Sequence, residues 1–339
     1  MELYTFDIEG MQSDYKVLLD LYHKATREFD RYNIYLELLH LKRLDKRLSR
    51  NEGVSKIIPS TYKKIAKNSE NKKLNFYLQL DELTRELCYY WTENLRSLEE
   101  LNINKSKLSE NIITHFEYYD EIVKFIAEKM PDDLRIVTNT FKKCQIRVRN
   151  SSIKKPSADI FYLEQLKKYY INILCRKALT IFDVGVAIHE FGHASSFMKS
   201  GKWDPKDYIL KETIASLYEI LFIEYYLEGK RKELKLRELG HLFKSIGVYH
   251  LKNYFESVNE SNNTYLYYLD IVDSLYSHII AMTIIAKSNS QEEIDTKMSY
   301  IKSNAPFARA FPLLGNIGIT EEDLIDTSKH VRQIILKNN

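Results

Sequence analysis

The chain has 339 residues, 44% of them hydrophobic, which suffices for one large or two modest domains with a substantial core. Its formal net charge is only +3, and basic residues are interspersed with acidic ones, so neither nucleic acid nor a membrane surface is indicated as a partner. The 3 cysteines are widely spaced, and the first residues lack the basic and apolar regions of a secretory signal. We therefore expect reduced thiols and a cytoplasmic protein without a membrane-spanning segment.

Helices dominate the expected secondary structure, because only 10 Gly and 6 Pro interrupt the chain. The spacing of apolar residues predicts a long helix within residues 12–50 and another over about 60–99. A third is predicted from about 104 to 130, and a shorter one over 132–143. These helices define an N-terminal region over 1–140, followed by a second region over 141–339.

The pattern changes near residue 144, where alternating apolar and polar residues predict short strands over 145–149, 158–163 and 169–174. Helices are predicted again over 183–201, 204–228, 231–258, 264–288, 290–303 and 319–337, with a loop between 305 and 318. The expected fold class is therefore mostly α, with a small β-sheet beside the helix that starts near residue 183.

That helix carries the HExxH sequence at residues 189–193. Four residues advance a helix by about 400°, so His189 and His193 leave the same face and can bind one zinc ion. Glu190 points toward the same cleft, where it is placed to take a proton from a zinc-bound water. A solvated helix face is the alternative. A separate apolar stripe, with Asp183 as N-cap and Gly201 after the last turn, favours a metal-binding helix that is buried on one side.

Glu212 is the predicted third zinc ligand. It lies two turns inside a helix that begins at Asp204-Pro205, and an antiparallel packing of the two helices would place it opposite both histidines. Two His and one Glu leave the fourth position open for water, as in catalytic zinc sites. Glu219 is two turns further on, and we predict that it accepts the other N–H of a ligand histidine.

Residues 183–219 resemble the thimet oligopeptidase and oligoendopeptidase F family of zinc metallopeptidases. Gly192 matches the glycine of the family's HExGH motif, and Asp183 matches an aspartate six residues before the first histidine. Glu212, Ser216 and Glu219 follow the run of Glu, Ser and Glu that opens with the family's third ligand. The resemblance is weaker over about 140–182, is detectable as a pattern over 264–287 and 301–337, and is faint or absent over about the first 130 residues.

The resemblance implies a zincin-type catalytic domain over 141–339 with one Zn²⁺ per chain, and a shortened N-terminal region that forms part of the cleft wall. It implies an endopeptidase that hydrolyses short peptides, with an edge strand of the small sheet binding the substrate backbone. A purely structural hairpin is the alternative for these strands. For function, two alternatives remain open: a peptide-binding relative that has lost efficient hydrolysis, and a dedicated processing protease. The sequence does not indicate an oligomeric state.

The hydrogen-bond donor to the developing oxyanion cannot be transferred from the family, whose His and Tyr residues fall on other residue types within 264–278. On a helix, Tyr265, Tyr268 and Tyr276 share one face. We predict that Tyr268 or Tyr276, with Tyr265 nearby, supplies the donor. An aromatic core stripe is the alternative reading. In that case the donor lies elsewhere, for example at His250 or His278.

Overall fold

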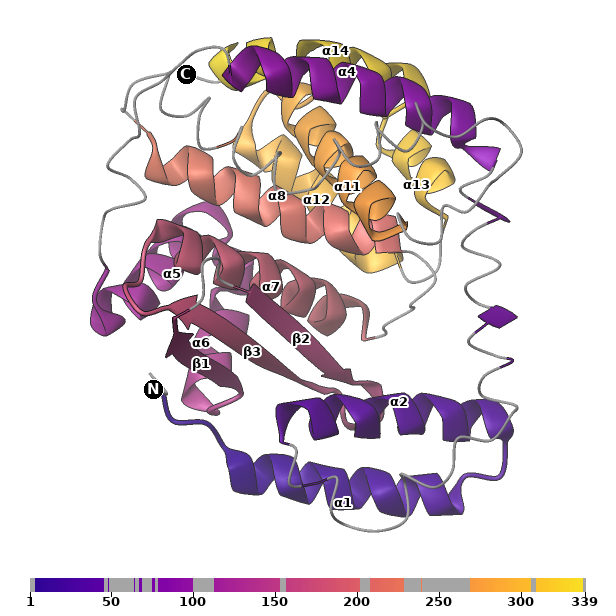
Figure 1. Cartoon of the computed structure of the whole chain (residues 1–339), viewed down its shortest axis with the longest axis vertical. Helices are drawn as coiled ribbons and strands as arrows, with labels where there is room; N and C mark the ends of the chain where they lie inside the picture. Colours follow the sequence, from indigo (N-terminus) through magenta and orange to yellow (C-terminus); the bar gives the residue numbers. More distant parts are fainter. Residues whose placement is uncertain are drawn as a thin grey trace.

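The structure is a computed structural model. It describes residues 4–45, 48, 64, 67–68, 75–76, 79–99, 113–152, 157–201, 208–228, 239, 269–305 and 309–337. In this part of the chain the protein is mostly helical, with one small three-stranded mixed sheet, as the sequence predicts (Figure 1). The described helices are all too short or too polar to cross a lipid bilayer.

The sheet consists of β1 (Ile146–Ser151), β2 (Ser157–Leu163) and β3 (Lys168–Arg176), which confirms the three predicted strands. The order is β1-β3-β2, with β1 parallel and β2 antiparallel to the central β3. Because side chains alternate along a strand, the sheet has two faces. Tyr162 and Ile171 belong to the main core, whereas Phe161 and Tyr170 belong to a second core with the N-terminal helices.

The main core is built around two long helices, α7 (Ile181–Ser200) and α8 (Tyr208–Tyr226). Figure 1 shows α7 between the sheet and α8. On its other side α8 contacts α11 (Leu269–Ala286), which packs on α14 (Glu321–Lys337). Helix α4 (Asp81–Glu99) covers α14 at the top of the view, and α12 (Gln291–Asn304) contacts α7 and α8.

The helix predicted within 12–50 is in fact a hairpin of α1 (Ile8–Lys24) and α2 (Glu28–Leu44). The chain turns at Ala25, whose backbone is extended and whose carbonyl oxygen accepts hydrogen bonds from the Arg31 guanidinium. The hairpin buries Leu18 and Leu38 completely against the second face of the sheet. A single straight helix could not place the apolar residues of both segments against the sheet, so the turn that forms the hairpin buries more apolar surface.

The next helices match the predictions more closely. Thr114 begins α5 (His115–Lys129) with a reciprocal capping box, and α6 (Leu134–Lys142) follows a short 3-10 turn, η3 (Pro131–Asp133). Helices α4 and α5 share the main core with α7. The division of the chain into regions 1–140 and 141–339 stays a prediction. The helix start predicted at 204–205, the predicted helix over 231–258 apart from residue 239, and most of 60–78 lie outside the described residues.

One predicted loop is partly helical. Between 305 and 318 the chain forms α13 (Ala310–Asn316), which contains Pro312 and Gly315. Pro312 is the third residue of this helix, where a backbone N–H has no partner within the helix, so proline is tolerated there. The helix predicted over 319–337 is confirmed as α14. Thr320 and Asp323 cap it reciprocally, with Thr320 N donating to Asp323 Oδ2 over 2.9 Å.

Candidate metal centre

The start of α7 is fixed by Asp183, although not as the N-cap. Thr180 is the N-cap, and the Asp183 carboxylate accepts from Thr180 N over 2.8 Å as its capping-box partner. The same carboxylate accepts from Arg176 N over 2.9 Å and forms an ion pair with the Arg176 guanidinium. Asp183 therefore anchors the start of α7 to the end of β3, and its carboxylate bonds to the helix start rather than to a histidine.

Gly192 lets α7 and α8 approach each other closely at the level of the histidines. A Cβ at this position would lie 2.9 Å from Ala215 Cα and 3.2 Å from the carbonyl oxygen of Ile214. Any larger residue would push the two helices apart. The glycine inside the HExxH sequence is therefore required by the packing that brings Glu212 to His189 and His193.

The structure brings the three predicted ligands together. His189 Nε2 lies 3.4 Å from Glu212 Oε2, and His193 Nε2 lies 3.5 Å from the same oxygen. Donor atoms of all three residues lie within 4.8 Å of one another. A tetrahedral ion with ligand bonds near 2.05 Å separates its donors by about 3.3 Å, close to the observed separations. His189, His193 and Glu212 can therefore hold a metal ion.

Glu219 lies where the sequence predicts a carboxylate for a ligand histidine. Its Oε2 is 3.3 Å from His189 Nδ1, on the far side of the ring from Glu212. A donor bond from Nδ1 to this carboxylate leaves the Nε2 lone pair directed at the metal position. Glu219 and Glu212 thus hold the His189 ring in one orientation.

Burial and the neighbouring charges set the protonation states of the two histidines and Glu212. Burial opposes ionisation of Glu212, but its interactions with His193 and His189 outweigh burial and hold its pKa well below the usual value. Burial lowers the pKa of His193 to about 4. Burial would also lower the pKa of His189, yet its bonds to Glu212 and Glu219 raise that pKa well above the usual value. Glu212 is therefore anionic and His193 neutral at pH 7, which are their metal-ligating states, whereas His189 must release a proton before it can bind a metal ion.

Glu190 is buried beside this group, with 6% of its surface exposed. Burial is the main reason that its pKa rises to about 7; the charge of His189 lowers it, and the charge of Glu212 raises it further. A carboxylate whose pKa lies near neutrality can both accept and return a proton at pH 7. The structure therefore places the predicted base in an environment suited to that role.

Tyr162 and Lys211 also belong to this site, and the sequence analysis did not find them. Burial raises the pKa of Tyr162 well above its usual value, and the charges of Glu190 and Glu212 raise it further. Lys211 Nζ lies 3.6 Å from Glu212 Oε1 and 5.8 Å from the centre of the Tyr162 ring. Strand alternation can show that Tyr162 faces inward, but no sequence signal shows which helix it meets.

Of the tyrosines predicted as oxyanion donors, Tyr276 is the one that the structure describes. Tyr276 is fully buried, its hydroxyl hydrogen-bonds with Thr84 Oγ1 over 3.0 Å, and its ring packs against Phe311. This is the aromatic-core alternative, with the phenol directed toward α4. His278 lies nearer the metal group, since the charge of Glu219 acts on it, and its Nδ1 lies 2.7 Å from the Ser274 carbonyl oxygen. Tyr265, Tyr268 and His250 lie outside the described residues.

A buried cluster connects α12 to α7 and α8 close to the metal group. Lys302 Nζ donates to Asp133 Oδ2 and to the Tyr218 hydroxyl, each over 2.7 Å. Ser195 Oγ donates to Asp133 Oδ1 over 2.7 Å, and the Tyr218 hydroxyl also donates to Asp133. Lys302 is only 3% exposed. Because Ser195 follows His193 and Tyr218 follows Glu212 by less than two turns, this cluster fixes the two ligand-bearing helices relative to each other.

Comparison with known proteins adds no further information on this site. No family model matches the chain, and no curated protein and no solved structure matches it. The functional assignment of the metal group therefore rests on its own residues and their geometry.

Proposed function

We propose that the protein is a zinc-dependent endopeptidase that hydrolyses short peptides, of the thimet oligopeptidase and oligoendopeptidase F type. The observation that carries this proposal is the group of His189, His193 and Glu212, whose Nε2–Oε2 separations of 3.4 and 3.5 Å suit a tetrahedral ion. Two imidazoles and one carboxylate form a ligand set typical of catalytic zinc. Glu190 lies beside this group with a pKa of about 7.

Hydrolysis of a peptide bond at this site would need a Lewis acid and a general base. A zinc ion bound here supplies a Lewis acid for the scissile carbonyl and for the attacking water. The Glu190 carboxylate accepts one proton from that water as its oxygen attacks the carbonyl carbon, and then delivers the proton to the leaving amine nitrogen.

The substrate backbone would bind along β2. This strand is paired on one side with β3, and no other described strand lies on its second side. Its residue Tyr162 comes close enough for the charges of Glu190 and Glu212 to act on its phenol. Strand addition fixes an extended chain through its main chain, so short peptides are favoured over folded proteins. The structural-hairpin alternative for β2 stays open.

For the oxyanion donor, Tyr265 and Tyr268 remain predictions. Tyr162 is a further candidate, because its phenol has a raised pKa next to the carboxylates of the site and so stays protonated at pH 7. A phenol that stays protonated can donate a hydrogen bond to an oxyanion.

The test compares Glu190→Gln with the wild-type protein on quenched peptides, with and without a chelator. Gln has the shape of Glu but cannot accept the proton, so we expect turnover to fall by about 10²–10⁴-fold while zinc content stays unchanged. Glu292→Gln, at an exposed position on α12, is the matched control and should behave like the wild-type protein. Comparable turnover in the Glu190→Gln protein would exclude this mechanism.

A peptide-binding relative without efficient hydrolysis is the second candidate. The burial of Tyr276 against α4 favours it, because this removes one of the phenols expected to stabilise the transition state. A wild-type protein that binds zinc and peptides without turning them over would establish this alternative. Efficient cleavage of a native folded protein, with poor cleavage of short peptides, would instead indicate a processing protease.

A further inference from the structure

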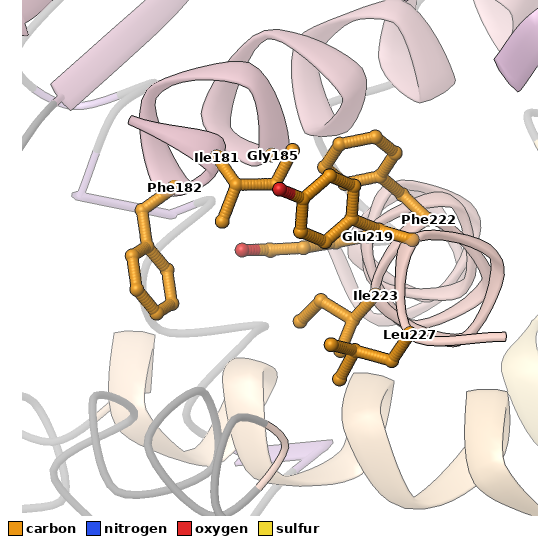
Figure 2. Close-up of a pocket in the computed structure, with 8 residues that line it drawn as sticks. Ile181, Phe182, Gly185, Glu219, Phe222, Ile223 and Leu227 are labelled. Carbon is orange, nitrogen blue, oxygen red and sulfur yellow. The ribbon is translucent and has the colours of Figure 1, made fainter. Parts of the chain in front are cut away.

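The two sides of the His189 ring have different surroundings. On its Nδ1 side Glu219 lies at 3.3 Å, and Figure 2 shows this side chain in a small, mostly apolar pocket with Gly185 and Phe222. On its Nε2 side lies Glu212, whose Oε2 is 3.4 Å away. The metal position is on the Glu212 side, so a substrate would meet the groups around Glu212 rather than the pocket.

Lys211 brings a positive charge to that side. Its Nζ lies 3.6 Å from Glu212 Oε1, while Oε2 of the same carboxylate faces the two histidines. Neighbouring residues of a helix point about 100° apart, so the lysine side chain bends toward the metal group. Its charge acts on Glu212, Glu190 and His193 alike. A single carboxylate thus separates the ammonium group from the metal position.

Lys211 also faces β2, along which the substrate backbone is proposed to bind. Its Nζ lies 5.8 Å from the centre of the Tyr162 ring on that strand. The side chain of Lys211 is 18% exposed, close to the 23% of His189 and the 25% of Glu212. Tyr162 as a whole residue is only 3% exposed. A substrate at the metal group can therefore reach the lysine more readily than the buried tyrosine.

Two uses of this lysine are a hold on Glu212 and a contact with a negatively charged oxygen of the substrate. The first has a cost, because an ammonium group beside a divalent cation repels it and weakens its binding. The second meets a need of the site. Glu190, Glu212 and Glu219 bring three carboxylates to the metal group, and these repel negative charge that develops on a substrate. Both points favour the contact with substrate.

We infer that Lys211 stabilises the negatively charged oxygen that forms on the scissile carbonyl during hydrolysis. The inference rests on the proposed function. As the water oxygen bonds to the carbonyl carbon, one electron pair of the C=O bond moves onto the carbonyl oxygen, and Glu190 takes the water proton. The pair returns as the C–N bond breaks, and the nitrogen, which keeps the electrons of that bond, takes the proton from Glu190. Lys211 keeps its proton throughout. Its ammonium group has three N–H donors, so a bond to Glu212 does not exclude a second acceptor.

The first experiment compares Lys211→Met and Lys211→Arg with the wild-type protein on quenched peptides. Met has a long side chain without the charge, so kcat should fall by about 10²–10³-fold with little change in KM. Arg keeps the charge and should recover most of this loss. Lys199→Met makes the same substitution at an exposed position on α7 and should behave like the wild-type protein. Unchanged kcat in the Lys211→Met protein would overturn the inference.

Zinc affinity separates this role from a hold on Glu212. In competition with a coloured chelator, Lys211→Met should bind zinc as tightly as the wild-type protein or more tightly, because a repulsion is removed. This result would also show that the variant folds. If Lys211 only positions Glu212, zinc binding should instead weaken by about 10–100-fold, and turnover should return at saturating zinc. That outcome would overturn the inference.

The C-terminal carboxylate of a short peptide is another negative group that Lys211 could contact. Each peptide is therefore compared with a free and with an amidated C-terminus. Stabilisation of the carbonyl oxygen predicts that Lys211→Met lowers kcat equally for both forms. A loss confined to peptides with a free carboxylate, seen as a higher KM, would assign Lys211 to the end of the substrate and reject the inference.

Binding of a phosphinic peptide to the zinc-loaded proteins separates the inference from the proposed function. In this probe a tetrahedral phosphorus with a negatively charged oxygen replaces the scissile amide, so it resembles the transition state and is not cleaved. Lys211→Met should bind it about 10²-fold more weakly than the wild-type protein, and Lys199→Met should bind it equally well. If the wild-type protein cleaves no peptide, the peptidase assignment fails and this comparison alone decides on Lys211. Equal binding by Lys211→Met and the wild-type protein would reject the role of Lys211 and leave the peptidase assignment intact.

Discussion

Replacing Gly192 by alanine tests whether the close contact of α7 and α8 holds the metal ligands in place. The added Cβ would lie 2.9 Å from Ala215 Cα, 3.2 Å from the Ile214 carbonyl oxygen and 3.2 Å from Tyr218 Cγ. Two of these atoms belong to the backbone of α8, so a side-chain rotation cannot relieve the contact. The helices must move apart, and Glu212 moves away from the histidines with them.

Gly185→Ala is the matched control, because it makes the same change in the same helix where the nearest atom is 3.8 Å away. Both variants gain about 1 kcal/mol from the better helix propensity of alanine. The difference between their free energies of unfolding therefore isolates the steric contact, which we expect to cost about 1–3 kcal/mol as overpacking in a tight core.

Urea denaturation of both variants in the presence of a chelator measures this difference, and competition with a coloured chelator measures zinc affinity. We expect Gly192→Ala to bind zinc about 10–100-fold more weakly than Gly185→Ala, a loss like that caused by disturbing the support around a metal ligand. Equal stability and equal zinc affinity in the two variants would refute the reasoning, because the contact at Gly192 would then have no effect on the ligands.

Three further predictions concern single residues. Glu212→Ala should lose the zinc that the wild-type protein retains at about one ion per chain, the count for a single site; full zinc content by elemental analysis would assign the third ligand elsewhere. Glu219→Gln should weaken zinc binding by about 10–100-fold, because it removes the carboxylate that orients His189; unchanged affinity in chelator competition would exclude that role. Asp133→Asn should cost about 3–5 kcal/mol in urea denaturation, because Lys302 keeps a buried charge without its carboxylate. Burial opposes the ionisation of Asp133, but Lys302 and the hydrogen bonds outweigh it and lower its pKa. Its contribution is therefore present above the ordinary pKa of about 3.9 and is lost as pH falls through the lower folded value, so the variant should lose less stability in acid; identical pH profiles would contradict this.

The candidate metal group was predictable because helix geometry converts sequence spacing into position. His189 and His193 are four residues apart, which places them on one face of any α-helix. Glu212 required one more assumption, an antiparallel second helix, and the observed separations of 3.4 and 3.5 Å agree with it. The position of Glu219 beside His189 follows from the same two helices.

Contacts between distant segments could not be predicted in this way. Spacing shows that Tyr276 lies on a helical face, but not that its hydroxyl meets Thr84 on α4. Nothing in the sequence pairs Lys302 with Asp133, because that contact depends on how α12 packs against α7. The N-terminal cap of α7 could also be predicted only in part. Thr180 and Asp183 bond reciprocally, so the sequence shows a cap but not which residue has the non-helical backbone.

The position of the ligands along the chain has a consequence for the order of folding. His189, His193 and Glu212 all belong to residues 189–212, so closure of two neighbouring helices brings them together at a small loss of chain entropy. The Lys302–Asp133 pair spans a far longer stretch, and we expect it to form later, since distant contacts are slow to close. Metal binding is coupled to folding, so an ion captured by α7 and α8 can serve as a template before the C-terminal helices are in place. Refolding with zinc present from the start should then proceed faster than refolding with zinc added at the end.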